Sequence, residues 1–471
     1  HRDLHSFPTR RSSDLAIIKA GIQFTTSGYR LLVRDVVLAN DGTEFVPGTE
    51  GYRMLTGEFV SKHIVRCRNE ELVYLAVHNH GGYDSVGFSR DDLASQAKGY
   101  PALLDIVNGP PVGAVVFAKN AIAGRLWLSV TDIIDLSSAS IIGPSFRHLF
   151  PTPQPQPKLI SKDYDRQSRL FGDRGQEILA NLTVGVIGAG GVGSLVIEYL
   201  ARLGVGRFVI ADPERLDLTN LPRVTGATRF DAMAFFTKHG RPAWLRQIGQ
   251  RLSAKKVNVM KRIIHRANPN ANVEVIFGDF VDENVANRFL KCDYLFNAAD
   301  SLQARLVFNA MVHAYLIPGV DLGAKVPVDK ETGTVGDVRA VVHPVLPGCG
   351  CLLCNGFIPS GRLQQEMETP AERRFQRYVD DEDIVAPSVI SLNALAASHA
   401  VNDFLFSVTG LTHDDSMSGY LRILPRSRRI VHESPRKDEL CPHCSTQGLG
   451  LFAQGNKASL PTRQSANNRR K

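Results

Sequence analysis

Residues 183–200 read TVGVIGAGGVGSLVIEYL: an apolar run, a glycine-rich turn and a segment with helical spacing. In a strand-turn-helix unit, glycines let the backbone approach phosphate groups, and the helix N-terminus stabilises their negative charge. Asp212 ends the next apolar run, where a carboxylate can accept hydrogen bonds from ribose hydroxyls. These features predict a nucleotide site, and by themselves they fit a dinucleotide-binding dehydrogenase as well. The glycines expected at the phosphates are Gly188, Gly190, Gly191 and Gly193.

Strand-like and helical segments alternate on the carboxyl side of this turn. The apolar runs are FVIAD, VEVIFGD, YLFNAAD and IPGVDLG, and helical stretches separate them. This alternation predicts a Rossmann-like, doubly wound parallel sheet, and DVRAVVHPVL then predicts an antiparallel extension. Residues 16–145 contain shorter β-rich runs and a helical stretch near 58–70, typical of a smaller mixed α/β domain. The expected class is α/β.

Changes in composition mark the expected boundaries. Residues 1–15, HRDLHSFPTRRSSDL, match nothing that follows, and we expect them to be an artefact joined to a truncated gene. The proline-rich segment PTPQPQP predicts a linker over 146–161. The nucleotide-binding domain is expected over 162–447. Residues 448–471, rich in Gly, Gln, Ser, Asn and Arg, predict a disordered tail.

Composition narrows the class of protein. The 471 residues are 43% hydrophobic and 22% charged, which excludes a collagenous or wholly disordered chain. The net charge of +8 is spread without a basic stripe, so we expect no nucleic-acid partner. Seven cysteines are too few for a secreted disulfide framework, which favours a cytoplasmic protein. The most apolar stretch, 178–197, is interrupted by glycines and polar residues, and we expect no membrane segment.

Four polar residues near the expected crevice favour ATP over a nicotinamide cofactor. A carboxylate that attacks the α-phosphate requires cations against the developing negative charge, and a carboxylate that holds Mg²⁺. Arg223 and Lys256 can supply the cations, although Lys255 could replace Lys256. Asp300, after YLFNAAD, can hold the metal. Asn220 lies with Arg223 in the segment TNLPR.

Residues 162–447 resemble the ThiF, MoeB and HesA group of ubiquitin-activating-type adenylyltransferases. The resemblance rests on DYDRQSRLFG, GAGGVG, Asp212, the N-L-x-R element, Lys256 and Asp300 in AADS. It implies that Arg166 reaches ATP across a homodimer interface, and that ATP and Mg²⁺ serve to adenylate the C-terminal glycine of a small ubiquitin-like or sulfur-carrier protein. The chain departs from the family by a longer segment before Lys256, including FDAMAFFTKHGRPAW, which we expect to contact the substrate or partner.

Many relatives transfer the acyl group to a cysteine after the first cysteine pair. The corresponding loop here, residues 355–388, contains none. We expect the two nearby thiols to be a core residue, Cys292, and an uninvolved neighbour, Cys349. Adenylation without a thioester on this chain is therefore the prediction.

Two Cys-x-x-Cys pairs predict a structural zinc site. Four thiolates fill a tetrahedral Zn²⁺ shell and leave no position for water, so a catalytic role is not expected. The alternative, two redox pairs, lacks a thioredoxin-like context. The four ligands are Cys351, Cys354, Cys441 and Cys444.

A second metal site is predicted near the N-terminus. His78 and His80 leave a strand on the same side, and Asp92 can complete a three-ligand zinc site with one open position. Residues 16 to about 130 resemble JAB (JAMM, MPN-like) metalloisopeptidases, which implies that Ser89 stabilises an oxyanion. Eight residues instead of seven separate His80 from Ser89, so Asp91 is an alternative ligand.

That family uses a glutamate before the first core strand as its general base, and none is evident here. Asp14, Glu44 and Glu50 are weak substitutes, so we expect metal binding with poor hydrolysis. The combined expectation is an enzyme that activates a ubiquitin-like protein, fused to a peptidase that matures or removes it. The alternatives are sulfur-carrier activation for thiamine or molybdopterin synthesis, a non-catalytic module that binds ubiquitin folds, and a Rossmann oxidoreductase.

Overall fold

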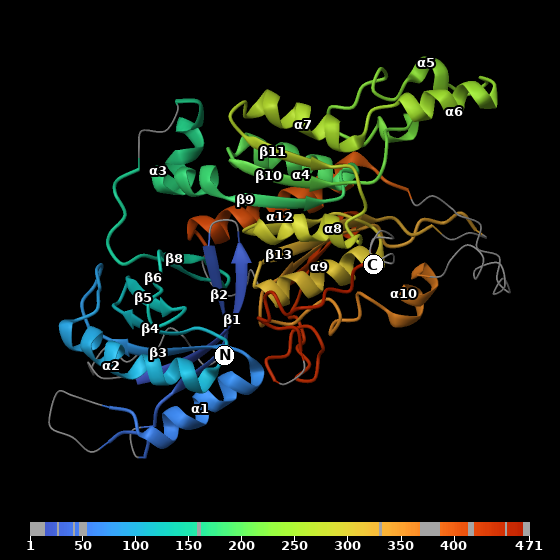
Figure 1. Ribbon diagram of the computed structural model, residues 1–471. Helices are drawn as coiled ribbons and strands as arrows, with labels where there is room; N and C mark the ends of the chain where they lie inside the picture. Colours follow the sequence, from blue (N-terminus) through green and yellow to red (C-terminus); the bar gives the residue numbers. More distant parts are fainter. Residues whose placement is uncertain are drawn as a thin grey trace. The chain divides into compact units, whose positions relative to one another are not determined.

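The computed structural model describes residues 15–25, 28–40, 43–46, 54–157, 162–328, 332–367, 387–412, 419–447 and 450–464. The expected artefact up to residue 14, Asp14 and Glu50 lie outside these residues. The chain divides into two units (Figure 1). One is built from the residues up to and including Ile141, with Arg147–Gln156 and Ala453–Ala458. The other contains Ile142–Phe146, Pro157–Phe452 and the residues from Ser459 onward.

The second unit is built on an eight-stranded sheet in the order β11-β10-β9-β12-β13-β14-β15-β16. The first five strands are parallel, and the last three continue the sheet antiparallel. The predicted doubly wound sheet and its extension are therefore confirmed. The strands are β9 (Thr183–Ile187), β10 (Arg207–Ala211), β11 (Asn272–Ile276), β12 (Tyr294–Asn297), β13 (Gly319–Lys325), β14 (Arg339–Val345), β15 (Tyr420–Leu424) and β16 (Arg429–Glu433).

Helices connect the strands of this unit. The α-helices are α3 (Asp165–Asn181), α4 (Gly191–Arg202), α5 (Ala234–Thr237), α6 (Ala243–Leu252), α7 (Lys256–Ala267), α8 (Glu283–Ala286), α9 (Leu302–Tyr315), α10 (Ser360–Met367) and α12 (Ile390–Thr409). Short 3-10 turns occur at η1 (Lys162–Tyr164), η2 (Leu218–Asn220), η3 (Asn287–Lys291) and η5 (Pro425–Ser427).

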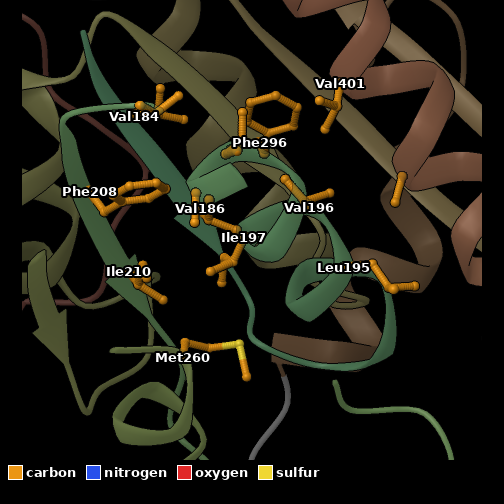
Figure 2. Packing of buried hydrophobic residues seen from close by; sticks show 14 of the residues in the cluster. Val184, Val186, Leu195, Val196, Ile197, Phe208, Ile210, Met260, Phe296 and Val401 are labelled. Atoms are coloured by element: carbon orange, nitrogen blue, oxygen red, sulfur yellow. The ribbon is translucent and has the colours of Figure 1, made fainter. Parts of the chain in front are cut away.

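The parallel strands are buried on both faces, as their continuous apolar composition predicts. Figure 2 shows one face, where Val184 and Val186 of β9 pack in a cluster with Val196 of α4 and Met260 of α7. On the other face Gly185 leaves room for neighbours, because a Cβ there would lie 2.7 Å from side-chain atoms of Leu295 and Phe289. The two apolar layers fix β9, and with it the start of the glycine turn.

The first unit is a six-stranded mixed sheet in the order β2-β1-β3-β4-β5-β6. Only β3 and β4 are parallel, and α2 lies between them in the chain, so the predicted mixed α/β domain is confirmed at this level. The elements are β1 (Leu15–Thr25), β2 (Gly28–Leu38), α1 (Gly57–Glu70), β3 (Val73–Asn79), α2 (Arg90–Val107), β4 (Val112–Phe117), β5 (Ile122–Trp127), β6 (Ile133–Asp135), β7 (Ala139–Ile141) and β8 (Arg147–Leu149).

The linker and the tail differ from expectation. Arg147–Leu149 form β8 and pair with β7, so the segment expected as linker from 146 begins inside folded structure. The expected tail is ordered over 450–464. In the first unit Gly455 forms a bridge with Ile22, and Asn456 donates its backbone N–H to the Ile22 carbonyl at 2.9 Å. These contacts use backbone groups, which composition does not reveal.

The described residues include no helix that is both long and apolar enough to cross a membrane. The stretch 178–197 instead ends α3, forms β9 and begins α4.

Candidate functional sites

The glycine turn lies at the topological switch point of the sheet, where the order of successive strands reverses. β9 has β10 on one side and β12 on the other, and ligands of doubly wound sheets bind at such a point. Gly188 has a φ of +89°, and a Cβ there would lie 3.1 Å from the Ala298 backbone. Gly193 lies so close to the turn that its Cβ would meet the Gly188 carbonyl oxygen. At Gly190 a Cβ would meet nothing within 4 Å, so the turn is open there.

Asp212 lies directly beside this turn. Its Oδ2 accepts a hydrogen bond from the Ala189 N–H at 2.7 Å, and its Oδ1 accepts one from the Glu214 N–H at 2.8 Å. The residue is 5% exposed, and this burial raises the pKa of Asp212 against the opposing effects of Lys256 and the two N–H groups. The carboxylate therefore holds the turn in shape and stands where the sequence predicts a ribose contact.

The two adjacent lysines occupy different environments. Lys256 is the first residue of α7, is 5% exposed and forms an ion pair with Glu214, close enough to lower the pKa of Asp212. Lys255 places its Nζ 4.3 Å from the centre of the Phe277 ring. The geometry therefore favours Lys256 over Lys255 as the cation at the crevice.

Arg223 and Asn220 differ in what they do. A Cβ at Gly191 would lie 3.3 Å from the Arg223 Cδ, so the arginine stem crosses the glycine turn, and its Nη1 donates to the Thr219 carbonyl at 3.3 Å. Asn220 is buried, and its Oδ1 accepts a hydrogen bond from the Asp217 N–H at 3.1 Å. Asn220 thus stabilises the 3-10 turn that precedes Arg223 in the chain. The sequence did not indicate this structural role.

Asp300 and Arg166 are both exposed. Asp300 follows β12, whose end is tied to β9 by a 2.9 Å hydrogen bond from the Ala298 N–H to the Ile187 carbonyl. The carboxylate therefore lies at the same edge of the sheet as the glycine turn. Arg166 lies in the first turn of α3, and no hydrogen bond or ion pair of the described residues joins it to the glycine turn.

A buried polar network next to this edge was not anticipated. Asp321 of β13 is 1% exposed; its Oδ1 accepts from Asn297 Nδ2 at 2.8 Å and from Arg305 Nε at 3.1 Å, and its Oδ2 lies 3.3 Å from His343 Nδ1. Burial alone would raise the pKa of Asp321, but the arginine and histidine together lower it. An aspartate inside the apolar run IPGVDLG is the one sequence signal that could have indicated this network.

The four cysteines of the two pairs converge. Three sulfur–sulfur distances are 3.5 Å for Cys351–Cys354, 3.6 Å for Cys351–Cys441 and 3.6 Å for Cys354–Cys444. A tetrahedral Zn²⁺ with Zn–S bonds of about 2.3 Å separates its sulfurs by about 3.8 Å. The donor set and its spacing therefore fit a closed structural zinc site. Of the two thiols outside the pairs that the sequence analysis considered, Cys292 is fully buried, which agrees with a core role.

A second ligand cluster lies in the first unit. His78 Nε2 and His80 Nε2 are 3.0 Å apart, and they lie 3.3 Å and 3.1 Å from the two oxygens of Asp92. All three ligand atoms lie within 4.8 Å of one another, which fits a zinc ion with a further position open. Of the two candidate aspartates, Asp92 and not Asp91 belongs to this cluster.

Ser89 acts on Asp92 in this structure. It is the N-cap of α2, where its hydroxyl donates to Asp92 Oδ2 at 2.7 Å and accepts from the Asp92 N–H at 3.1 Å. Burial would raise the pKa of Asp92, but the Ser89 hydrogen bonds and both histidines together lower it. Glu44 accepts a 2.6 Å hydrogen bond from the Asn40 N–H and is not part of the ligand cluster.

A doubly wound sheet with a glycine turn, a buried carboxylate and a buried lysine at the switch point defines a nucleotide-binding α/β protein. The chain belongs to the ThiF family, whose model matches residues 164–443. That match lies within the second unit. The likeness of residues 16–145 to JAB metalloisopeptidases stays a prediction.

Individual relatives match parts of the chain at low sequence identity. The tRNA threonylcarbamoyladenosine dehydratase of Bacillus subtilis (strain 168) is 33% identical over 140 residues, 30% of this chain and 47% of that protein. The chain thus spans about half the length of this relative. The sulfur carrier protein ThiS adenylyltransferase of the same organism is 25% identical over 296 residues, covering 62% of this chain and 74% of that protein. Among solved structures, the crystal structure of Escherichia coli MccB with ATP matches with 18% sequence identity and a TM-score of 0.44. The match covers 61% of this chain and 75% of the MccB chain.

Proposed function

We propose that the second unit uses ATP to adenylate the C-terminal carboxylate of a small ubiquitin-like or sulfur-carrier protein. The observation that carries this proposal is the placement of Asp212 and Lys256 against the open glycine turn. Membership of the ThiF family supports it, as does a relative named for sulfur-carrier adenylylation. The buried Asp212 would bind the ribose, and the turn with the N-terminus of α4 would bind phosphates.

The reaction forms a bond between a substrate carboxylate oxygen and the α-phosphorus, and it breaks the bond from that phosphorus to the oxygen of the leaving pyrophosphate. Arg223 and Lys256 would stabilise the negative charge that develops. Lys256 is now neutralised by Glu214, whose side chain is 65% exposed, so a triphosphate can replace that partner. Asp300 would hold Mg²⁺, which supplies charge neutralisation on the phosphates when bound.

The proposal includes a homodimer in which Arg166 acts on the nucleotide of the second copy. Its exposed position on α3 leaves the guanidinium available for this. The test mixes two inactive variants, Arg166→Ala and Lys256→Met. After random exchange of subunits about half of the dimers are mixed, and each mixed dimer has one of its two sites with both residues intact. Activity should therefore return to about a quarter of wild type. A mixture that stays inactive excludes the shared site.

We propose the longer segment between Arg223 and Lys256, which includes FDAMAFFTKHGRPAW, as a contact for the partner protein. Phe230 is 80% exposed, Phe235 69% and Trp244 63%. Exposed aromatic side chains among arginines are typical of protein interfaces. Asp231, held by Arg262 through two hydrogen bonds, anchors this segment to α7.

For the first unit we propose a zinc site of His78, His80 and Asp92 that serves isopeptidase chemistry on the same class of partner. Bound zinc would supply an activated water. Ser89 would keep the Asp92 carboxylate oriented toward both histidines. Because residues 1–15 contain no glutamate that could serve as the general base before β1, we expect slow hydrolysis.

The decisive experiment is exchange of labelled pyrophosphate into ATP, with Mg²⁺ and a carrier protein that ends in Gly-Gly. We expect exchange that disappears when the last glycine is deleted. A thiocarboxylate formed with sulfide would assign the enzyme to sulfur-carrier activation, whereas binding of the carrier without exchange would reduce it to a binding module. Nicotinamide binding without exchange would refute the proposal in favour of an oxidoreductase.

A further inference from the structure

Four basic side chains converge at the outer end of β13. Lys325 and Arg339 are cross-strand partners in the antiparallel pair β13–β14. Arg362 of α10 and Arg305 of α9 lie close enough to Lys325 to act on its charge. Like charges opposite one another destabilise a sheet. A fold that keeps such a cluster has an unfavourable interaction that an anion would remove.

The positive charge is not compensated within the described chain. Lys325, Arg339 and Arg362 form no ion pair among the residues that the structure describes. Partial burial, and then repulsion from the three arginines, lowers the pKa of Lys325. Arg305 donates a hydrogen bond from its Nε to Asp321, and its two terminal nitrogens make no hydrogen bond to described residues. The cluster thus has free donors as well as excess charge.

Two carboxylates on the neighbouring elements are already engaged. Asp321 is shared by Arg305, Asn297 and His343. Glu366 lies one turn after Arg362 on α10, but its oxygens accept the Leu302 and Gln303 N–H groups at 2.9 Å and 3.1 Å. No carboxylate of the described residues is among the groups that act on the Lys325 charge.

The position of the cluster relates it to the nucleotide site. Asp321 pairs with Asn297, the last residue of β12, so both lie at the edge of the parallel sheet where the glycine turn begins. Lys325 lies four residues further along β13, about 13 Å beyond that edge at about 3.3 Å per residue. A polypeptide whose terminal carboxylate reaches the α-phosphate, and which leaves the crevice along β13, would cross this distance.

We propose that Lys325, Arg339 and Arg362, with the free nitrogens of Arg305, bind an acidic side chain in the C-terminal segment of the protein substrate. An extended chain covers about 13 Å in about four residues, which places the acidic residue fourth to sixth from the end. The inference rests on the proposed adenylation for the direction of the substrate. It adds a specificity: the cluster selects substrates with acidic C-terminal segments and repels basic ones.

The test measures binding without chemistry. Fluorescein-labelled decapeptides that end in Gly-Gly carry one glutamate at the third, fifth or ninth position from the end, or glutamine at the fifth. Fluorescence anisotropy with the full chain gives each Kd in low and high salt. We expect the peptide with glutamate at the fifth position to bind at least about tenfold more tightly than its glutamine counterpart at low salt, since charge-assisted hydrogen bonds to several cations are strong.

Variants separate the cluster from general basicity. Lys325→Gln combined with Arg362→Gln should reduce the preference to about onefold, while Lys261→Gln, an exposed lysine on α7, should leave it unchanged. Equal binding of all peptides, absence of binding, or a preference that survives the double variant would overturn the inference. Because no ATP is present, a failure of pyrophosphate exchange is read separately and concerns only the proposed reaction.

Discussion

Asn309 of α9 donates its amide Nδ2 to the Nδ1 of His443, 2.8 Å away, across 134 residues of sequence. The same amide accepts the Leu352 N–H at its Oδ1, at 2.9 Å. His443 lies inside the pair Cys441-Cys444 and Leu352 inside the pair Cys351-Cys354, so one side chain joins both cysteine loops. Because an amide Nδ2 can only donate, His443 Nδ1 must be the acceptor.

The first prediction concerns this amide. Asn309→Leu preserves volume but leaves the Leu352 N–H and His443 Nδ1 unpaired, and we expect zinc affinity to fall by about 10- to 100-fold. Competition with a chromogenic chelator measures the affinity. The control is Asn268→Leu, which removes a buried 3.0 Å hydrogen bond to Val205 remote from the cysteines. If both variants lose zinc equally, Asn309 has no special relation to the metal site.

The second prediction separates the adjacent lysines. Lys256→Met should lower the rate of pyrophosphate exchange by about 100- to 1000-fold, because a cation against the developing charge is lost. Lys255→Met removes a side chain that lies on the Phe277 ring and should change the rate less than about threefold. Circular dichroism controls for folding. The opposite order of effects would assign the catalytic cation to Lys255.

The third prediction concerns metal content. Two ligand clusters of the described residues should bind two zinc ions per chain, measured by plasma mass spectrometry after dialysis. Asp92→Ala and Cys444→Ser should each remove one ion, and the double variant both. Asp91→Ala and Cys349→Ser change neighbours outside the clusters and should retain two ions. Loss of both ions from one single variant would contradict independent sites.

The fourth prediction concerns pH. Burial raises the pKa of Asp403 in α12 to about 7 from its usual 3.8. The folded state therefore binds more protons than the unfolded state between about pH 4 and 7, and its free energy of unfolding falls as pH rises through that range. Asp403→Asn should flatten this slope and stabilise the protein at pH 8 by about 1 to 3 kcal/mol.

Denaturant titrations from pH 5.5 to 8 measure that slope. Asp173→Asn is the matched control, because Asp173 is exposed on α3. It should leave the slope as in the wild type. An unchanged slope in Asp403→Asn would show that other groups control stability in this range.

Periodicity predicted the sheet of the second unit because its strands are buried on both faces, which leaves a signal in each strand's own composition. Val184, Phe208 and Phe296 each belong to such a run and meet in one core. The glycine turn and Asp212 could be predicted for a similar reason, since a turn near phosphates requires residues without side chains at fixed spacing.

Pairings across the sequence could not be predicted in this way. Lys255 and Lys256 are identical in type, and only the position at which α7 begins decides which is buried. Asn309 and His443 form a hydrogen bond that no local pattern indicates. Arg305 and Lys325 are ordinary surface-type residues until the fold brings their elements together.

The ordered segment after residue 450 has a consequence for how the protein is made. The pairing of β3 with β1 runs from Leu15 to Ala20 and stops there. Just beyond that point, Gly455 forms a bridge with Ile22 of β1. Gly21 has no side chain where the Ala453 carbonyl passes. During translation the edge of β1 therefore stays open until more than four hundred further residues have been synthesised. Ribosome-bound chains stalled before residue 453 should recruit chaperones to that edge, and a detached N-terminal fragment should aggregate unless the segment Ala453–Ala458 is supplied as a peptide.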